Sequence, residues 1–446
     1  MPSGARNGPC EPEGSNSNRA NRCAIVPPAA GTFSPQRPIL RLDGHSYSPS
    51  LLQAIVTAAA RLHSFADAAF ALGLSGLSIS PRHVQQLAHE IGTELVAARD
   101  ARADARRHRV LEPRVTTVPE VVVVEVDGGR LRTRATGCGP GVHQAEGKED
   151  KIAALATLSD AAADADPCPE PPPSFVEPRR IQRLVAQMKE PAGETKPQER
   201  PGVAADASSD TPVPPATPAS EPWSPKRVVR TCVASLTNSR SFGPLVAAEA
   251  QSRNFYAAKR RAFVADGAAY NWTIQRGYFP DFEPIVDLLH VVCYLFHAAR
   301  AVSSDEAAGW TRYEAWLRAV WQGRVRDVIA AMTDHQDRLG RPPPEEQLSA
   351  SDPRQVLAEA VTYLRNHVGR MDYPRYRREG LPTTSSLVES LVGEFNARVK
   401  GRSKFWNRPA GAEAILQVRA AVLSEDGRLE QYFAHRPGRA SRRHAA

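Results

Sequence analysis

Apolar residues recur at helical spacing in the first patterned part of the chain. They do so over residues 51–59 and 65–72, and a third series begins at Ser80-Pro81, a helix N-cap followed by proline at the first helical position. Three helices with a glycine-containing turn before the third are typical of a helix-turn-helix DNA-binding unit, which we expect over residues 47–110. Arg82, Gln85 and Gln86 would lie on the exposed start of its recognition helix. A plain helical or dimerisation module is the alternative.

A run of β-branched residues follows. Residues 120–127 (EVVVVEVD) predict a buried strand, and Asp127-Gly128-Gly129 has the composition of a turn. The alternation over residues 130–136 then predicts a second strand, and residues 151–158 (KIAALATL) predict a third. We therefore expect a three-stranded antiparallel meander as the first part of a core, over residues 115–158.

The pattern resumes after a long interruption. A helix is expected over residues 244–260, a strand over 261–267, a short helix over 271–279, and a strand from 283 that gives way to a long helix. Helical periodicity continues from about 298 to 370, and two last helices are expected over 385–399 and 410–423. These patterns divide this part of the chain into a second part of the core (226–297), an all-α insertion (298–380) and C-terminal core helices (381–433).

Three segments lack such patterns. Residues 1–46 are rich in Pro, Gly, Ser and Asn, and residues 159–225 hold 15 of the 38 prolines, so both are expected to be disordered. Residues 434–446 form a basic tail. From residue 397 to the end there are eleven Lys/Arg and four Asp/Glu, and this surplus of seven carries nearly all of the net charge of +8. A basic stretch of this kind is expected to contact a phosphate backbone, or else to be a solvated tail.

Composition excludes some classes of protein. With 41% hydrophobic residues the chain can bury a core, but it has no apolar run long enough for a membrane span and no apolar leader near its start. Its six cysteines are scattered without a CxxC pair, which disfavours a disulfide framework or a structural zinc site. We expect a protein of a reducing cytoplasm, without a membrane partner.

The order of the predicted elements is that of an α/β ribonuclease H-like fold, in which acidic residues meet at one edge of the sheet. Asp127 and Asp266 each end a predicted strand and precede glycine, and Glu389 lies on a polar stripe of the helix over 385–399. Phosphodiester cleavage in such a fold uses two Mg²⁺ (or Mn²⁺) ions, which require carboxylate ligands. Taken alone, each of these three acids is just as typical of an ordinary turn or of a solvated helix face.

Five segments of the chain resemble insertion-sequence DDE transposases of the ISKra type, which belong to the Mutator-like superfamily. They are VVVEVDGGRLRTR, KEDKIAALATL, VADGAAYNW, IVDLLH and the block that begins TTSSLVESLVGEFNARVKGRSKFWN. The resemblance implies that Asp127, Asp266 and Glu389 are the catalytic triad and the metal ligands. It also implies that Asp287 and His290 support them through a DxxH motif, and that the all-α insertion contacts transposon ends.

The function expected from this resemblance is metal-dependent DNA cleavage and strand transfer at the ends of an insertion sequence. Its partners would be terminal inverted repeats and target DNA, bound by a nucleoid-associated homo-oligomer, with Lys400, Arg402 and Lys404 among the DNA contacts. Two alternatives stay open: a ribonuclease H-like nuclease that cleaves without joining, and a domesticated DNA-binding protein without catalysis.

Overall fold

The computed structural model describes residues 47–134, 145–189, 223–343, 348–401 and 404–436. Residues 52–432 form one compact unit, and the flanking residues on both sides belong to a second unit. The segment over 1–46, predicted to be disordered, and most of the basic tail over 434–446 lie outside the described residues. In the described part, no helix is both long enough and apolar enough to cross a membrane.

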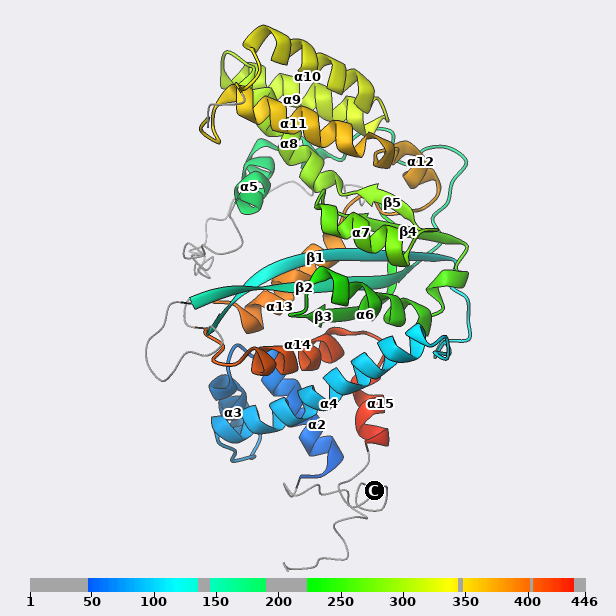
Figure 1. The fold of residues 1–446 in the computed structure, drawn as a ribbon, viewed down its shortest axis with the longest axis vertical. Helices are drawn as coiled ribbons and strands as arrows, with labels where there is room; N and C mark the ends of the chain where they lie inside the picture. Colours follow the sequence, from blue (N-terminus) through cyan, green and yellow to red (C-terminus); the bar gives the residue numbers. More distant parts are fainter. Residues whose placement is uncertain (1–46, 135–144, 190–222, 344–347, 402–403, 437–446) are drawn as a thin grey trace, which may run out of the picture. The chain divides into compact units, whose positions relative to one another are not determined.

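A five-stranded mixed sheet lies at the centre of the compact unit (Figure 1). Its strands are β1 (Val121–Arg134), β2 (Ala145–Leu158), β3 (Arg227–Ser235), β4 (Arg260–Ala265) and β5 (Glu283–Val286). They lie in the order β3-β2-β1-β4-β5; β2 is antiparallel to β1 and β3, whereas β4 is parallel to β1 and β5. The fold is therefore mixed α/β, as the sequence predicts.

The predicted turn at Asp127-Gly128-Gly129 is wrong. β1 continues straight through these residues, which pair with Ile152, Lys151 and Asp150 of β2. A Cβ atom on Gly128 or Gly129 would lie 2.8 or 2.9 Å from oxygens of Asp150. The glycines thus allow close approach between paired strands and do not reverse the chain. The expected second strand is the distal half of β1, and the third antiparallel strand is β3, which follows the proline-rich segment.

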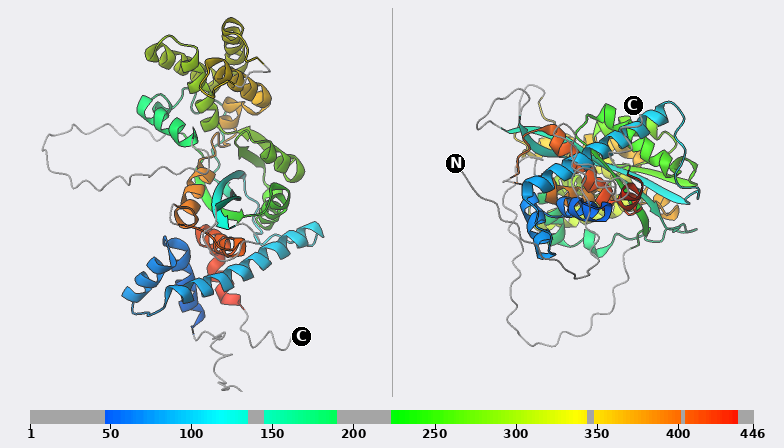
Figure 2. Two further views of the ribbon diagram at one scale, coloured as in Figure 1. Left: turned by 60° about the vertical axis from the view of Figure 1, so that its left-hand side comes forward. Right: turned by 90° about the horizontal axis from the view of Figure 1, so that it is seen from below.

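Helices cover both faces of the sheet. α6 (Ser239–Ser252) packs against β2 and β3, and α13 (Ser386–Val399) packs against β1 and β2. The two helices lie on opposite faces, as the rotated view in Figure 2 shows. α7 (Ala269–Tyr278) packs beside α6, and α14 (Pro409–Leu423) contacts β3; α15 (Arg428–His435) follows.

The three predicted N-terminal helices are present as α2 (Pro49–Arg61), α3 (Phe65–Leu74) and α4 (Pro81–Arg107). α4 is 27 residues long and packs along α14 and α6 of the core. A Cβ atom on Gly92 would lie 2.3 Å from the carbonyl oxygen of Ala414, so the axes of α4 and α14 approach closely at this glycine. These helices therefore share the core's packing and do not form a separate lobe.

The helical region between the second and third predicted acids is also present. It comprises α8 (Leu288–Ala301), α9 (Glu306–Trp321), α10 (Val325–Leu339), α11 (Pro353–His367) and α12 (Tyr373–Arg378). α5 (Pro178–Lys189) packs on α8, and three short 3-10 helices lie at Pro173–Phe175, Phe255–Ala257 and Val368–Arg370.

The prediction that residues 159–225 are disordered is wrong for the first part of that segment. Residues 159–189 are held against the helical region through their own backbone and side chains. The hydroxyl of Tyr313 donates to the carbonyl of Phe175 at 2.8 Å, and the indole of Trp321 donates to the carbonyl of Cys168 at 2.7 Å. Composition alone misses this docking because the donors come from α9, far along the chain. Residues 190–222 lie outside the described part.

Candidate metal centre

Three aspartates stand in register across the three parallel strands: one lies within β1, and the other two directly follow β4 and β5. Val126 of β1 pairs with Ala265 of β4, and Ala265 pairs with Val286 of β5. The residue that follows each of these three is an aspartate: Asp127, Asp266 and Asp287. Adjacent strands lie about 4.8 Å apart, so register alone places the three backbone positions side by side at one edge of the sheet.

α13 brings Glu389 to the same edge, and two buried acids hold its first turn. The backbone N–H of Ser385 donates to Oδ1 of Asp287 at 2.8 Å, and that of Val388 donates to Oε2 of Glu125 at 2.8 Å. These hydrogen bonds satisfy N–H groups that the start of a helix leaves without partners. The Ser385 hydroxyl in turn donates to Oε1 of Glu389 at 2.9 Å, which orients the carboxylate.

His290 lies in the first turn of α8, where Asp287 is the N-cap. Oδ2 of Asp287 accepts from the backbone N–H of His290 at 3.2 Å and lies 2.7 Å from its Nδ1. Burial disfavours a charged imidazole, but the hydrogen bond and the charge of Asp287 prevail and raise the pKa of His290 to about 9. In the absence of a bound metal, His290 is therefore protonated at neutral pH.

Asp287, His290 and Glu389 form a group that could hold a metal ion. Each offers one ligand atom, and these atoms all lie within 4.8 Å of one another. Of the three ligands predicted from the sequence, only Glu389 belongs to this group; Asp287 and His290 were expected to support the ligands rather than to join them.

The charges of Asp127 and Asp266 nevertheless act on this group. Burial raises the pKa of Asp127 to about 6, and the negative charges of Asp266 and Asp287 add to the effect. Burial also raises the pKa of Glu389 to about 7, with Asp287 again contributing. Oδ1 of Asp266 accepts hydrogen bonds from the backbone N–H of Ala268 at 2.9 Å and from Asn271 at 2.7 Å. The four acids and His290 thus form one electrostatically linked cluster that a cation would stabilise.

Further charged residues lie beside the cluster, and sequence reasoning missed their part in it. Asp150 is fully buried, and burial raises its pKa to about 6, with the charge of Asp127 adding to the effect. Nζ of Lys151 lies 3.0 Å from Glu149 and 4.0 Å from the ring centre of Tyr270. The signal in the sequence was the charged run Lys148-Glu149-Asp150-Lys151, directly before the apolar half of the same strand.

The predicted DNA contacts fall into two groups. Arg82, Gln85 and Gln86 are exposed in the first turns of α4, in the place expected for residues that reach a ligand. Lys404 differs from the expectation, because its ammonium donates to the carbonyls of Ala397 at 2.7 Å and of Arg398 at 2.9 Å, at the end of α13.

Of the other two predicted contacts in this basic stretch, Lys400 is partly buried, and its charge lowers the pKa of Asp150 against the larger effect of burial. Arg402 lies outside the described residues. Within this basic stretch, Lys404 therefore binds the end of α13, and Lys400 acts on the buried acid Asp150.

No protein-family model matches the chain, and no curated protein matches it.

Proposed function

We propose that the chain is a DDE transposase that cleaves DNA at the ends of an insertion sequence and joins the freed ends to target DNA. The observation that carries this proposal is the in-register row of Asp127, Asp266 and Asp287, joined by Glu389 from α13. An enzyme that cleaves phosphodiesters with metal ions uses such a concentration of carboxylates, because they bind the cations that neutralise the reacting phosphate.

The order of the strands supports a ribonuclease H-like core for this enzyme. Three antiparallel strands, β1 to β3, continue into the parallel strands β4 and β5, in the order β3-β2-β1-β4-β5. The ribonuclease H-like fold has this order, and in it the acids at the ends of the first and fourth strands meet. Asp127 lies in β1 and Asp266 directly follows β4.

The donor set fits a divalent cation that prefers oxygen ligands, with one imidazole nitrogen in addition. Asp287 engages Nδ1 of His290, which leaves Nε2 as the nitrogen available to a metal. A bound Mg²⁺ or Mn²⁺ would stabilise the negative charge that develops on the phosphate and would lower the pKa of a water. In this proposal Asp127, Asp266 and Glu389 are the carboxylate ligands and Nε2 of His290 is the nitrogen donor beside them. Asp287 is a positioning residue that orients both His290 and α13.

The reaction needs no covalent enzyme intermediate. A water attacks a phosphodiester at the end of the element, the bond from phosphorus to the 3′ oxygen breaks, and a 3′-hydroxyl is released. That hydroxyl then attacks a phosphodiester of the target DNA, and the displaced target oxygen leaves. The carboxylates would hold the metal ions through both steps. The enzyme acts as a homo-oligomer that brings the two ends of the element together.

The test uses DNA that carries the inverted repeats flanking the reading frame, with Mg²⁺ and supercoiled target DNA. We expect cleavage and joining by the wild-type chain. Asp127→Asn, Asp266→Asn and Glu389→Gln should each abolish both steps without lowering the melting temperature, since each removes one of several repelling charges. Asp281→Asn is the matched control, because Asp281 is exposed and precedes β5 without joining the cluster.

The outcomes separate three functions. Cleavage without joining identifies a ribonuclease H-like nuclease, and sequence-specific binding without cleavage identifies a domesticated DNA-binding protein. Full activity in any one of the three variants removes that residue from the triad.

End recognition is tested separately through α4. Arg82→Ala should weaken binding to the repeats and reduce the dependence of affinity on salt by about one ion, because one phosphate or base contact is lost. Arg107→Ala, an exposed arginine at the other end of α4, is the control. If the two variants bind the repeats with equal affinity, the helices α2 to α4 form a structural module that does not recognise the ends.

A further inference from the structure

A second concentration of charge surrounds a cavity away from the candidate metal centre. The cavity has a volume of about 270 Å³ and lies among α4, α6, β3, α14 and the start of α15. Four arginines line it, Arg99, Arg102, Arg114 and Arg428, together with the buried acid Glu249. None of these residues belongs to the metal centre, so the cavity needs an explanation of its own.

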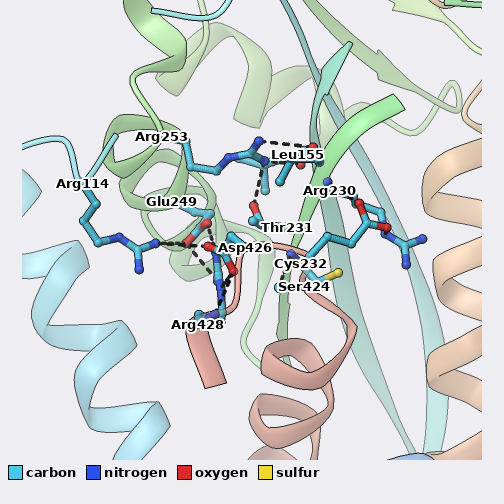
Figure 3. A network of polar contacts seen from close by, with 12 residues as sticks. Arg114, Leu155, Arg230, Thr231, Cys232, Glu249, Arg253, Ser424, Asp426 and Arg428 are labelled. Atoms are coloured by element: carbon cyan, nitrogen blue, oxygen red, sulfur yellow. Dashed lines mark hydrogen bonds and ion pairs between the residues drawn. The ribbon is translucent and has the colours of Figure 1, made fainter. Parts of the chain in front are cut away.

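Two of the four arginines are already neutralised. Arg428 lies 2.5 Å from Glu249 and 2.8 Å from Asp426, and Figure 3 shows the three side chains converging. Arg99 lies 2.5 Å from Glu413. Burial opposes ionisation of Glu249, but the charge of Arg428 prevails and lowers the pKa of Glu249 to about 2, so this acid is ionised and serves as the closest counter-charge of Arg428.

The other two arginines are less closely paired with acids. Arg114 has only long contacts, at 3.7 Å to Glu249 and 4.0 Å to Asp426, and both of these acids already pair with Arg428. The guanidinium of Arg102 is partly buried and, within the described part of the chain, forms neither an ion pair nor a hydrogen bond. Burial lowers the pKa of Arg102, and the charges of Arg428 and Arg114 lower it further against the opposing effect of Glu249.

We propose that this cavity binds a phosphate group, with Arg102 and Arg114 as its principal ligands. A guanidinium offers paired N–H donors that match two phosphate oxygens, and an unpaired cation in a partly dry site gains most from such a partner. The volume is sufficient for a phosphate or a diphosphate. The phosphate can belong to a small free compound or to a DNA strand, and the experiment distinguishes these two sources. The proposal does not depend on the catalytic function.

The first arm measures binding of inorganic pyrophosphate to the full chain by calorimetry. We expect the wild-type chain to bind it, and Arg102→Ala to weaken binding at least tenfold. Arg107→Ala is the matched control, because Arg107 is on the same helix and 69% exposed, with only Asp104 as a partner. Arg102→Ala should fold normally, since the guanidinium that it removes has neither an ion pair nor a hydrogen bond among the described residues.

The second arm repeats the comparison with a labelled DNA duplex and with pyrophosphate as competitor. If the phosphate belongs to DNA, Arg102→Ala lowers the affinity for the duplex relative to Arg107→Ala, and pyrophosphate displaces the duplex. If it belongs to a small compound, the duplex binds both variants equally while Arg102→Ala still loses pyrophosphate. The proposal is overturned if pyrophosphate binds the two variants equally, or if it does not bind and the duplex affinities are also equal.

Discussion

Asp150 is the acid beside the metal centre whose burial has the most direct consequence for stability. It lies in β2 opposite Gly129, and its side chain is fully buried. Neither carboxylate oxygen has a hydrogen-bond partner among the described residues. We predict that Asp150→Asn, which keeps the shape and removes the charge, stabilises the protein at alkaline pH and has little effect at acidic pH.

The magnitude follows from the pKa. Burial raises the pKa of Asp150 from 3.8 to about 6, and a shift of this size corresponds to about 3 kcal/mol of folding free energy. Because the folded-state pKa of this acid is raised, its favourable contribution is present below pH 3.8 and is lost as the pH rises through about 6. The buried amide of asparagine also lacks a partner, which costs about 1–2 kcal/mol. The net gain at pH 8 should therefore be about 1–2 kcal/mol.

Urea unfolding of the wild-type chain and the variant at pH 8 and pH 5, in the presence of EDTA, measures this gain. The unfolding midpoint of Asp150→Asn should lie above that of the wild-type chain at pH 8, and the difference should shrink at pH 5. Glu146→Gln, an exposed position of the same strand, should leave both midpoints unchanged. A midpoint for Asp150→Asn below that of the wild-type chain at pH 8 would refute the reasoning, because it would mean that the carboxylate has a stabilising partner.

Two further predictions concern packing. Gly92→Ala should lower the free energy of unfolding by about 1–3 kcal/mol, because its methyl group would meet the carbonyl of Ala414. Gly393→Ala, at an exposed position in the middle of α13, should raise it by about 0.5–1 kcal/mol. Thermal melting compares the two variants, and equal shifts in melting temperature would contradict the close contact between α4 and α14. Asp166→Ala should lower the free energy of unfolding by about 3–5 kcal/mol, because it leaves the fully buried guanidinium of Arg377 without the carboxylate that lies 2.5–2.8 Å away. An unchanged midpoint of urea unfolding would show that residues 159–189 are not docked through this pair.

Much of the local structure follows from the sequence. The β-branched run before Asp127, the strand before Asp266 and the change from strand to helix at Asp287 are visible as period and residue type, and the structure contains all three. The helices over 298–370 follow from their 3.6-residue period in the same way. These features are predictable because an element's period depends on which of its own residues turn to the core.

The candidate site was predictable only in part. The sequence predicts that Asp127, Asp266 and Glu389 meet at one edge of the sheet, with Asp287 and His290 near them, and the register of β1, β4 and β5 explains why the three aspartates align. The group that could hold a metal ion, Asp287, His290 and Glu389, comes together only when α13 is anchored to β1 and to the end of β5.

The sequence by itself determined most of the helices and the strands that lead up to Asp127, Asp266 and Asp287, because these depend on neighbours along the chain. Only the tertiary structure decided that β1 runs through two glycines, that residues 159–189 dock on α9, and that Lys404 binds the end of α13. The burial of Asp150 without a partner belongs to the same class. Each of these features depends on partners far away in the sequence. Burying a polar group costs free energy unless the fold places a hydrogen-bond or ion-pair partner beside it.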